Sequence, residues 1–223
     1  MQKPCIAPIH YRPVILITVN NETTKRCGPR LILASTSPRR REILAALGLE
    51  FAVCHVDIDE SPQDDEAPGD MVLRLAVAKA AAAPAAPDDI VIAADTVVVV
   101  DGRALGKPAD EDDCLAMLAA LAGRSHEVLT GVALRGAQGT RTAVSTTDVY
   151  FREIGRDEAR AYWQSGEPRD KAGAYAVQGL GGAFVERIEG SYSGVVGLPV
   201  FETVALLGAA GLEVLRQQTV NDG

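Results

Sequence analysis

The sequence lacks the features that mark several classes of protein. None of its four cysteines (Cys5, Cys27, Cys54 and Cys114) belongs to a CxxC pair, and no histidine stands at zinc-ligand spacing. This pattern favours the reduced thiols of the cytoplasm over disulfides or a structural zinc. The longest apolar runs, such as residues 14–19, are far too short to cross a bilayer. The sequence has no P-loop motif, no GxGxxG fingerprint and no internal repeat.

Positive charge is also scarce. The chain has 22 lysines and arginines against 30 acidic residues, which gives a formal net charge of −8. Such a chain has no broad basic surface for DNA, RNA or an anionic membrane, so any anion site must be local. We therefore expect neither a nucleic-acid nor a membrane partner. The length of 223 residues and the hydrophobic content of 47% are enough for one α/β domain.

Residues 1–30 fit this domain poorly. Pro4, Pro8 and Pro13 interrupt them, and the apolar run at residues 14–19 is shorter than the apolar region of about 7 to 15 residues in a signal peptide. We expect a loosely ordered N-terminal extension over residues 1–30 whose loss is tolerated, or else a natural start further downstream. A single domain is expected over residues 31–218.

The most informative stretch is LILASTSPRRREILAALG, which covers residues 31–48 and indicates a strand, a phosphate loop and a helix. The apolar residues 31–34 predict a short strand. Ser37 is then the expected N-cap, because Pro38 suits the first helical position, where no N–H partner is needed. Gly48 supplies the expected end of the helix.

An anion would be well placed at this helix start. Free backbone N–H groups, the hydroxyls of Ser35 and Ser37, and the guanidinium groups of residues 39–41 meet there, where the helix dipole favours negative charge. Three arginines also oppose that dipole, which a bound phosphate would relieve. We therefore interpret Ser35 and Ser37 as substrate-binding candidates. The alternative is a solvated basic face.

An acidic loop follows the strand expected at residues 51–56. Seven acidic residues and no basic one stand between Asp57 and Asp70, together with prolines and a glycine that indicate a loop. The carboxylates nearest the strand, Asp57, Asp59 and Glu60, are candidates for holding a hard divalent cation. The alternative is a loop whose carboxylates only face solvent.

Two charged residues interrupt otherwise apolar elements. Lys79 ends the apolar stripe of a helix expected over residues 71–82, where a lysine either reaches water or presents its charge to a pocket. Asp95 lies within residues 90–100, the strongest buried-strand pattern of the chain. An unpaired carboxylate in a β core is costly, so Asp95 must be paired, metal-bound, protonated or at a strand end that faces a cleft. We favour a catalytic role over a structural hydrogen bond.

The second half of the chain offers further donors. Lys107 is held between Gly106 and Pro108, and the segment at residues 166–182 is dense in glycine and charge. Its glycines permit close approach to a ligand, and Lys171 and Gln178 offer donors, although an irregular surface loop is the alternative. The other expected elements are helices at 111–121, 155–166 and 199–207, a hairpin of strands at 127–134 and 141–151 that we interpret as scaffold, and a strand at 184–188.

Several motifs occur in one order along the chain: LASTSPRR, AADT, LGKP, TGVAL, DKAGAY, VQGLGG and GSYSGVVGLP. Together they resemble the Maf family of nucleoside triphosphate pyrophosphatases, over about residues 31–207. The resemblance implies a single α/β domain in which an elongated mixed β-sheet is flanked by helices around a deep nucleotide-binding cleft, similar to the Maf and ITPase folds. It also implies a cytoplasmic homodimer and metal-dependent hydrolysis of a nucleoside triphosphate to the monophosphate and pyrophosphate.

The resemblance carries over residue by residue. It makes Asp95 the catalytic proton acceptor, and it makes Glu60 and Asp95 the ligands of a divalent metal, with Mg²⁺ expected and Mn²⁺ or Co²⁺ as alternatives. The phosphate-binding positions that it implies are Arg40, Lys79 and Lys107. The three positions that divide the family by substrate are Arg39, Thr96 and Gln178.

These last three residues resemble the branch acting on dTTP and UTP, an activity that would limit incorporation of non-standard nucleotides into nucleic acids. Three alternatives stay open. The first is hydrolysis of 7-methyl-GTP by the same site. The second is a nucleotide-binding regulator of cell division and septum formation, which needs no turnover. The third is nucleotidyl transfer, which also uses metal carboxylates and a basic phosphate loop.

Overall fold

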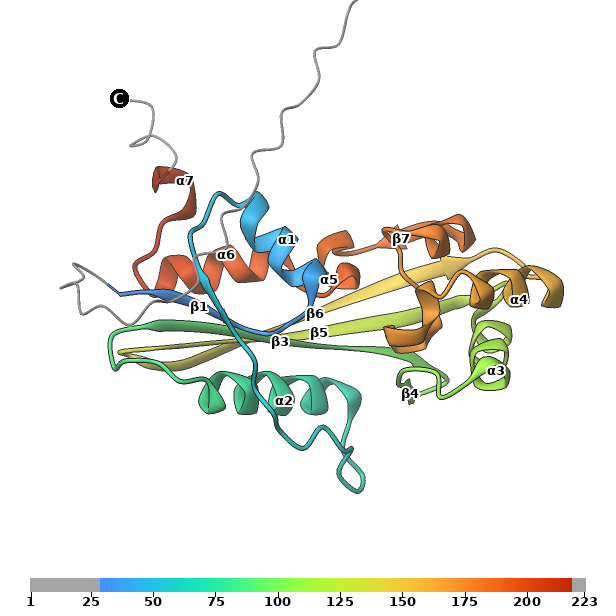
Figure 1. The fold of residues 1–223 in the computed structure, drawn as a ribbon, viewed down its shortest axis with the longest axis horizontal. Helices are drawn as coiled ribbons and strands as arrows, with labels where there is room; N and C mark the ends of the chain where they lie inside the picture. The colour runs from blue at the N-terminus through green and yellow to red at the C-terminus, as the bar shows by residue number, and fades with distance from the viewer. Residues whose placement is uncertain (1–28, 218–223) are drawn as a thin grey trace, which may run out of the picture.

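The computed structural model describes residues 29–217, so the expected N-terminal extension lies, apart from its last two residues, outside the described part of the chain. Figure 1 shows an elongated sheet along the long axis of the molecule, with α2 below it and α1, α5 and α6 above it. None of the helices within residues 29–217 is long and apolar enough to span a membrane. The expected architecture of a mixed sheet flanked by helices is confirmed.

Seven strands form one sheet in the order β2-β1-β3-β5-β6-β7, and β4 pairs with β3 outside this path. The pairs β1–β2 and β1–β3 are parallel, and all other pairs are antiparallel. The strands are β1 (Leu31–Ala34), β2 (Ala52–Cys54), β3 (Ile90–Val100), β4 (Arg103–Leu105), β5 (Ser125–Gly136), β6 (Gly139–Phe151) and β7 (Val185–Glu189).

The helices are α1 (Pro38–Ala46), α2 (Pro68–Ala82), α3 (Glu111–Leu121), α4 (Arg156–Gln164), α5 (Tyr192–Val196), α6 (Val200–Ala209) and α7 (Val214–Gln217). The expected bounds of β3 and α3 are confirmed. The segment at residues 166–182 is not an irregular loop, because it contains the short 3₁₀ helices η1 (Glu167–Asp170) and η2 (Ala172–Ala174) and the start of η3 (Leu180–Phe184). The sequence did not predict α5, whose single turn is stabilised by the Ser191 side chain, which accepts a hydrogen bond from the N–H of Gly194 at 3.0 Å.

Strand β3 is the centre of the core. Its first half packs alternately into two clusters: Ile90, Ile92 and Ala94 lie against α1 and α6, whereas Val91 and Ala93 lie against α2. Side chains of a strand alternate between its faces, so an element covered on both sides needs apolar residues at nearly every position. This explains the apolar residues at 90–94 that made β3 recognisable in the sequence.

One edge of β3 is only partly paired. Its other edge pairs with β5 from Val91 to Val99, whereas on this edge β1 pairs with residues 90–92 and β4 with residues 98–100. Residues 93–97 therefore have no strand partner there among the residues that the structure describes. The sheet is interrupted at this position, and Asp95 lies in the middle of the gap.

Candidate active site

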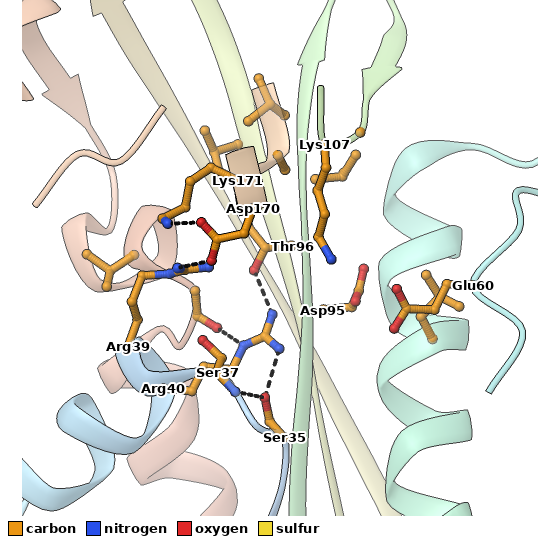
Figure 2. A pocket seen from close by; sticks show the side chains of 18 of the residues that line it. Ser35, Ser37, Arg39, Arg40, Glu60, Asp95, Thr96, Lys107, Asp170 and Lys171 are labelled. Atoms are coloured by element: carbon orange, nitrogen blue, oxygen red, sulfur yellow. Dashed lines mark hydrogen bonds and ion pairs between the residues drawn. The ribbon is translucent and has the colours of Figure 1, made fainter. Parts of the chain in front are cut away.

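A cavity of about 680 Å³ opens at the gap in the sheet. It brings together segments from both halves of the chain, including the start of α1, the end of α2, β3 and the segment that contains η1 and η2. Figure 2 shows many of these side chains from close by. The substrate-binding candidates Ser35 and Ser37 line this cavity, and so do the site residues that the family resemblance implies: Arg39, Arg40, Glu60, Lys79, Asp95, Thr96, Lys107 and Gln178.

Lys79 connects the two predicted metal carboxylates. Its Nζ lies 2.6 Å from Asp95 Oδ1 and 2.6 Å from Glu60 Oε1. The Lys79 and Asp95 side chains are only 10% and 14% exposed, whereas Glu60 is half exposed. Burial alone would raise the pKa of Glu60, but its hydrogen bond with Lys79 and the charges of Lys79 and Lys107 outweigh this and hold the pKa below its ordinary value. Asp95 is thus paired, as its position in a β core requires.

Arg40 is fixed by three acceptors from three separate segments. Its Nε donates to the carbonyl of Gly197 at 2.8 Å, one terminal nitrogen donates to Ser35 Oγ at 3.3 Å, and the other donates to Thr96 Oγ1 at 3.3 Å. A guanidinium carries five N–H donors, so two remain for a ligand. Burial lowers the pKa of Arg40 and Asp95 opposes that effect, yet an arginine stays charged in proteins. Arg40 is a pre-positioned anion-binding group.

Thr130, on β5, orients the hydroxyl of Thr96. Its own hydroxyl is fully buried, 2.8 Å from the Gly194 carbonyl oxygen and 3.0 Å from Thr96 Oγ1. A hydroxyl has one hydrogen and a carbonyl only accepts, so Thr130 donates to Gly194 and accepts from Thr96. Thr96 is thereby left as an acceptor for Arg40. The interpretation of β5 as mere scaffold needs correction, and no sequence signal would have revealed this pairing, because the Thr96–Thr130 register is set only when the strands meet.

The remaining cations of the cavity differ in how they are paired. Arg39 NH1 lies 3.6 Å from Asp170 Oδ2, and Asp170 also contacts the Lys171 ammonium. Lys107 is exposed, and Figure 2 shows its amine directed toward Asp95 and Glu60. Asp170 was missed as a site residue, although it stands in the DKAGAY motif beside Lys171.

Three charged residues named in the sequence analysis lie outside the cavity. Arg41 is exposed and does not line it, so the guanidinium groups of residues 39–41 do not all meet there. Asp57 and Asp59 do not line it either, and an Asp59 oxygen instead accepts the N–H of Ser61 at 2.9 Å. The chain runs past the end of β2 in an extended loop, and Glu60 alone of the three carboxylates reaches the Lys79 ammonium.

The start of α1 follows the prediction with one difference. Ser37 precedes the helix and Pro38 is its first residue, but the Ser37 side chain makes no capping hydrogen bond. The Ser37 N–H donates instead to Ser35 Oγ at 3.2 Å, the atom that also accepts from Arg40. The loop before α1 therefore serves to position Arg40.

Glu60 and Asp95 fit a divalent cation that arrives with a ligand. Residues 29–217 contain no group of three or more His, Cys, Asp or Glu residues placed to hold a metal. The two carboxylates nevertheless both approach one ammonium, so they face a common cation position. Mg²⁺ is usually bound through one or two carboxylates together with substrate phosphates and water. The cavity thus offers two carboxylates and several cations, which suits a polyphosphate with its metal.

Comparison with known proteins identifies relatives of the whole domain. The family model described as Maf-like protein matches residues 30–210. The chain is 54% identical over 189 residues to the dTTP/UTP pyrophosphatase of Hahella chejuensis, covering 83% of this chain and 94% of that protein. It is 52% identical over 179 residues to the dTTP/UTP pyrophosphatase of Vibrio parahaemolyticus, covering 79% of this chain and 95% of that protein. Among solved structures, the Staphylococcus aureus Ham1 protein aligns with a TM-score of 0.40 and 16% identity, over 55% of this chain and 71% of that chain.

Proposed function

Because the chain belongs to the Maf family, we propose that it hydrolyses nucleoside triphosphates to the monophosphate and pyrophosphate, with UTP and dTTP as preferred substrates. The observation that carries the proposal is the contact of Lys79 with both Glu60 and Asp95 in a cavity that also holds Arg40 and Lys107. Relatives more than 50% identical over nearly their whole length bear the name of this activity. Limiting the incorporation of non-standard nucleotides is the role that we propose for it.

The reaction requires a water molecule to attack the α-phosphorus in line with the departing pyrophosphate. Asp95 accepts the proton of that water, because its carboxylate lines the cavity at the open edge of β3 and Lys79 holds it in one orientation. The two free N–H groups of Arg40 and the ammonium of Lys107 bind the phosphates and offset the charge that develops on the leaving group.

We propose that the enzyme uses a divalent cation, Mg²⁺ in the first place with Mn²⁺ or Co²⁺ as alternatives. Glu60 and Asp95 would hold it, and the bound cation would supply charge neutralisation and polarise the attacking water. The cytoplasmic location and the homodimer that the resemblance implies stay predictions.

Base selection is assigned to Arg39, Thr96 and Gln178. The Gln178 side chain is exposed, lines the cavity and makes no hydrogen bond within residues 29–217. A free amide offers both an acceptor and donors, which matches the edge of a pyrimidine such as uracil. A larger purine should fit less well.

The test is pyrophosphate release by the purified protein in Mg²⁺ from UTP, dTTP, 7-methyl-GTP, GTP and ATP. Selective turnover of UTP and dTTP is expected. Comparable rates for GTP and UTP would refute the pyrimidine preference, and preferred turnover of 7-methyl-GTP would assign the chain to the other substrate branch. Nucleotide attached to an acceptor would indicate nucleotidyl transfer, and binding without turnover would favour the regulator of cell division.

A further inference from the structure

Gln178 stands on a short turn that is held at both ends by residues outside the cavity. The turn covers residues 176–181 and connects η2 with η3. Its side-chain amide has no partner in the described part of the chain, so nothing fixes the amide except the backbone that carries it. The placement of Gln178 therefore depends on what holds this turn.

A single carboxylate holds the far end of the turn. Glu167 Oε2 accepts the N–H of Leu180 at 2.9 Å, and Oε1 accepts the N–H of Gly181 at 2.9 Å. Oε1 also accepts the hydroxyl of Tyr162 at 2.7 Å. Hydrogen bonds to an ionised acceptor are about twice as strong as those between neutral groups.

Tyr162 holds the near end of the same turn. Its hydroxyl oxygen accepts the N–H of Ala176 at 3.1 Å while its hydrogen is donated to Glu167. The Tyr162 side chain is buried and packs edge-on against Phe184, with ring centroids 5.0 Å apart. Both ends of the turn are thus hydrogen-bonded to the pair of Glu167 and Tyr162, and the Tyr162 ring is held in place by its packing in the core.

Two glycines of the turn leave room for the Glu167 and Tyr162 side chains that hold it. A Cβ atom at Gly179 would overlap the Glu167 carboxylate, and one at Gly181 would lie 2.6 Å from the Tyr162 hydroxyl oxygen. The glycine density of the VQGLGG motif, which the sequence analysis attributed to a ligand, is here required by contact with a carboxylate of the protein itself.

Glu167 is also linked to the Arg39 side of the cavity. It is the first residue of η1, and the last residue of that short helix is Asp170, which pairs with Arg39. Neither Glu167 nor Tyr162 lines the cavity. Glu167 therefore bonds to the turn that carries Gln178 and shares a short helix with the partner of Arg39, while it does not itself line the cavity.

We propose that Glu167, together with Tyr162, is a positioning residue for base selection: it fixes the turn at residues 176–181 so that Gln178 presents its amide at one place in the cavity. The inference rests on the proposed function, because it concerns the same site and the same substrates. It assigns to Glu167 an effect on which base is accepted and none on the binding of the phosphates, which contact Arg40 and Lys107.

The test compares Glu167→Gln and Tyr162→Phe with the wild type. A glutamine has the same shape, but its NH₂ group opposes one of the backbone N–H donors. We expect the ratio of kcat/KM for UTP over GTP to fall about tenfold, through a higher KM for UTP, with kcat changed less. Binding of UTP and of inorganic tripolyphosphate, measured by calorimetry without turnover, should show weaker UTP binding and unchanged tripolyphosphate binding.

The matched control is Glu158→Gln, because Glu158 is an exposed glutamate of neighbouring α4 that pairs with Arg152 and lies away from the cavity. Glu158→Gln should leave the kcat/KM ratio of UTP over GTP unchanged, and it should leave the binding of UTP and of tripolyphosphate unchanged. Wild-type UTP preference in folded Glu167→Gln would overturn the inference, as would equal losses of UTP and tripolyphosphate binding. The proposed function alone would be refuted if the wild type bound UTP in preference to GTP but released no pyrophosphate. The inference would be refuted if the wild type showed no base preference in binding.

Discussion

The ammonium of Lys79 lies 2.6 Å from Oδ1 of Asp95, and this contact joins the last turn of α2 to the open edge of β3. Each residue disrupts the apolar pattern of its own element, and each does so at the point where the two elements meet. Burying either charge alone would be costly, whereas the pair is compensated. The contact thus explains both anomalies of the sequence together.

The first prediction concerns Asp95→Asn. The amide cannot accept the proton of the attacking water, so kcat should fall about 10²- to 10³-fold, similar to the loss of one electrostatic contact in other active sites. The fold should persist, because Lys79 keeps Glu60 as its partner. Rates of pyrophosphate release and a thermal melt measure the two effects. Asp101→Asn is the control, since Asp101 is exposed and pairs with Arg124, and wild-type turnover by Asp95→Asn would contradict the role of Asp95.

The second prediction concerns removal of divalent cations. A chelator should abolish pyrophosphate release, and added Mg²⁺ should restore it. The melting temperature of the protein without nucleotide should not change, because residues 29–217 hold no cluster of three or more metal donors. Assays and melts with and without Mg²⁺ check both points. Full activity in the chelator would disprove the metal requirement.

The third prediction concerns Thr130→Val. The change leaves the buried Gly194 carbonyl without its donor and frees the Thr96 hydroxyl to rotate, so that Arg40 loses a fixed acceptor. The free energy of unfolding should fall by about 1–3 kcal/mol, and kcat/KM for UTP should fall as well. Denaturant unfolding and steady-state kinetics measure the two effects.

Two further variants make the Thr130 test specific. Thr130→Ser keeps the hydroxyl and should restore most of the activity. Thr203→Val removes another fully buried hydroxyl, on α6, which has no hydrogen-bond partner among residues 29–217 and does not line the cavity. Stability should therefore be unchanged or higher. Equal effects of Thr130→Val and Thr203→Val would show that the Thr130 hydroxyl does not position the site.

The fourth prediction concerns pH and His126. Burial lowers the pKa of His126 to about 4 from 6.5, and its Nε2 lies 2.9 Å from the Tyr175 hydroxyl while the buried Nδ1 has no partner within the described residues. The unfolded chain binds the proton below pH 6.5, whereas the folded protein does so only near pH 4. Stability should therefore be complete above pH 6.5 and decline between 6.5 and 4, by at most about 3 kcal/mol.

Unfolding free energies of the wild type and His126→Leu across this range measure that effect. Other groups titrate in the same range in both proteins, so the difference between the two curves isolates the histidine. The wild type should lose stability more steeply than the variant as the pH falls. Parallel curves would show that the buried histidine is not the cause.

The sequence alone determined the elements whose signals are local. The bounds of β3 followed from a long apolar run that only Asp95 and Thr96 interrupt, and those of α3 from helical periodicity. Pro38 and Gly48 marked the start of α1 and the turn after it. The family resemblance also needed only the sequence, because its motifs occur in one order, and the residues that it implies for the site all line one cavity. Their roles stay predictions.

Only the tertiary structure decided how those residues meet. Asp95 and Thr96 are consecutive in β3, so their side chains leave opposite faces of the sheet. Asp95 contacts Lys79, and Thr96 contacts Arg40, as Figure 2 shows for the second pair. Both nevertheless line the same cavity, because β1 and β4 pair with opposite ends of β3 and leave residues 93–97 open between them. Strand register and the hydrogen bonds of Glu167 to the turn at residues 176–181 depend on contacts between residues far apart in the chain, which no local pattern encodes.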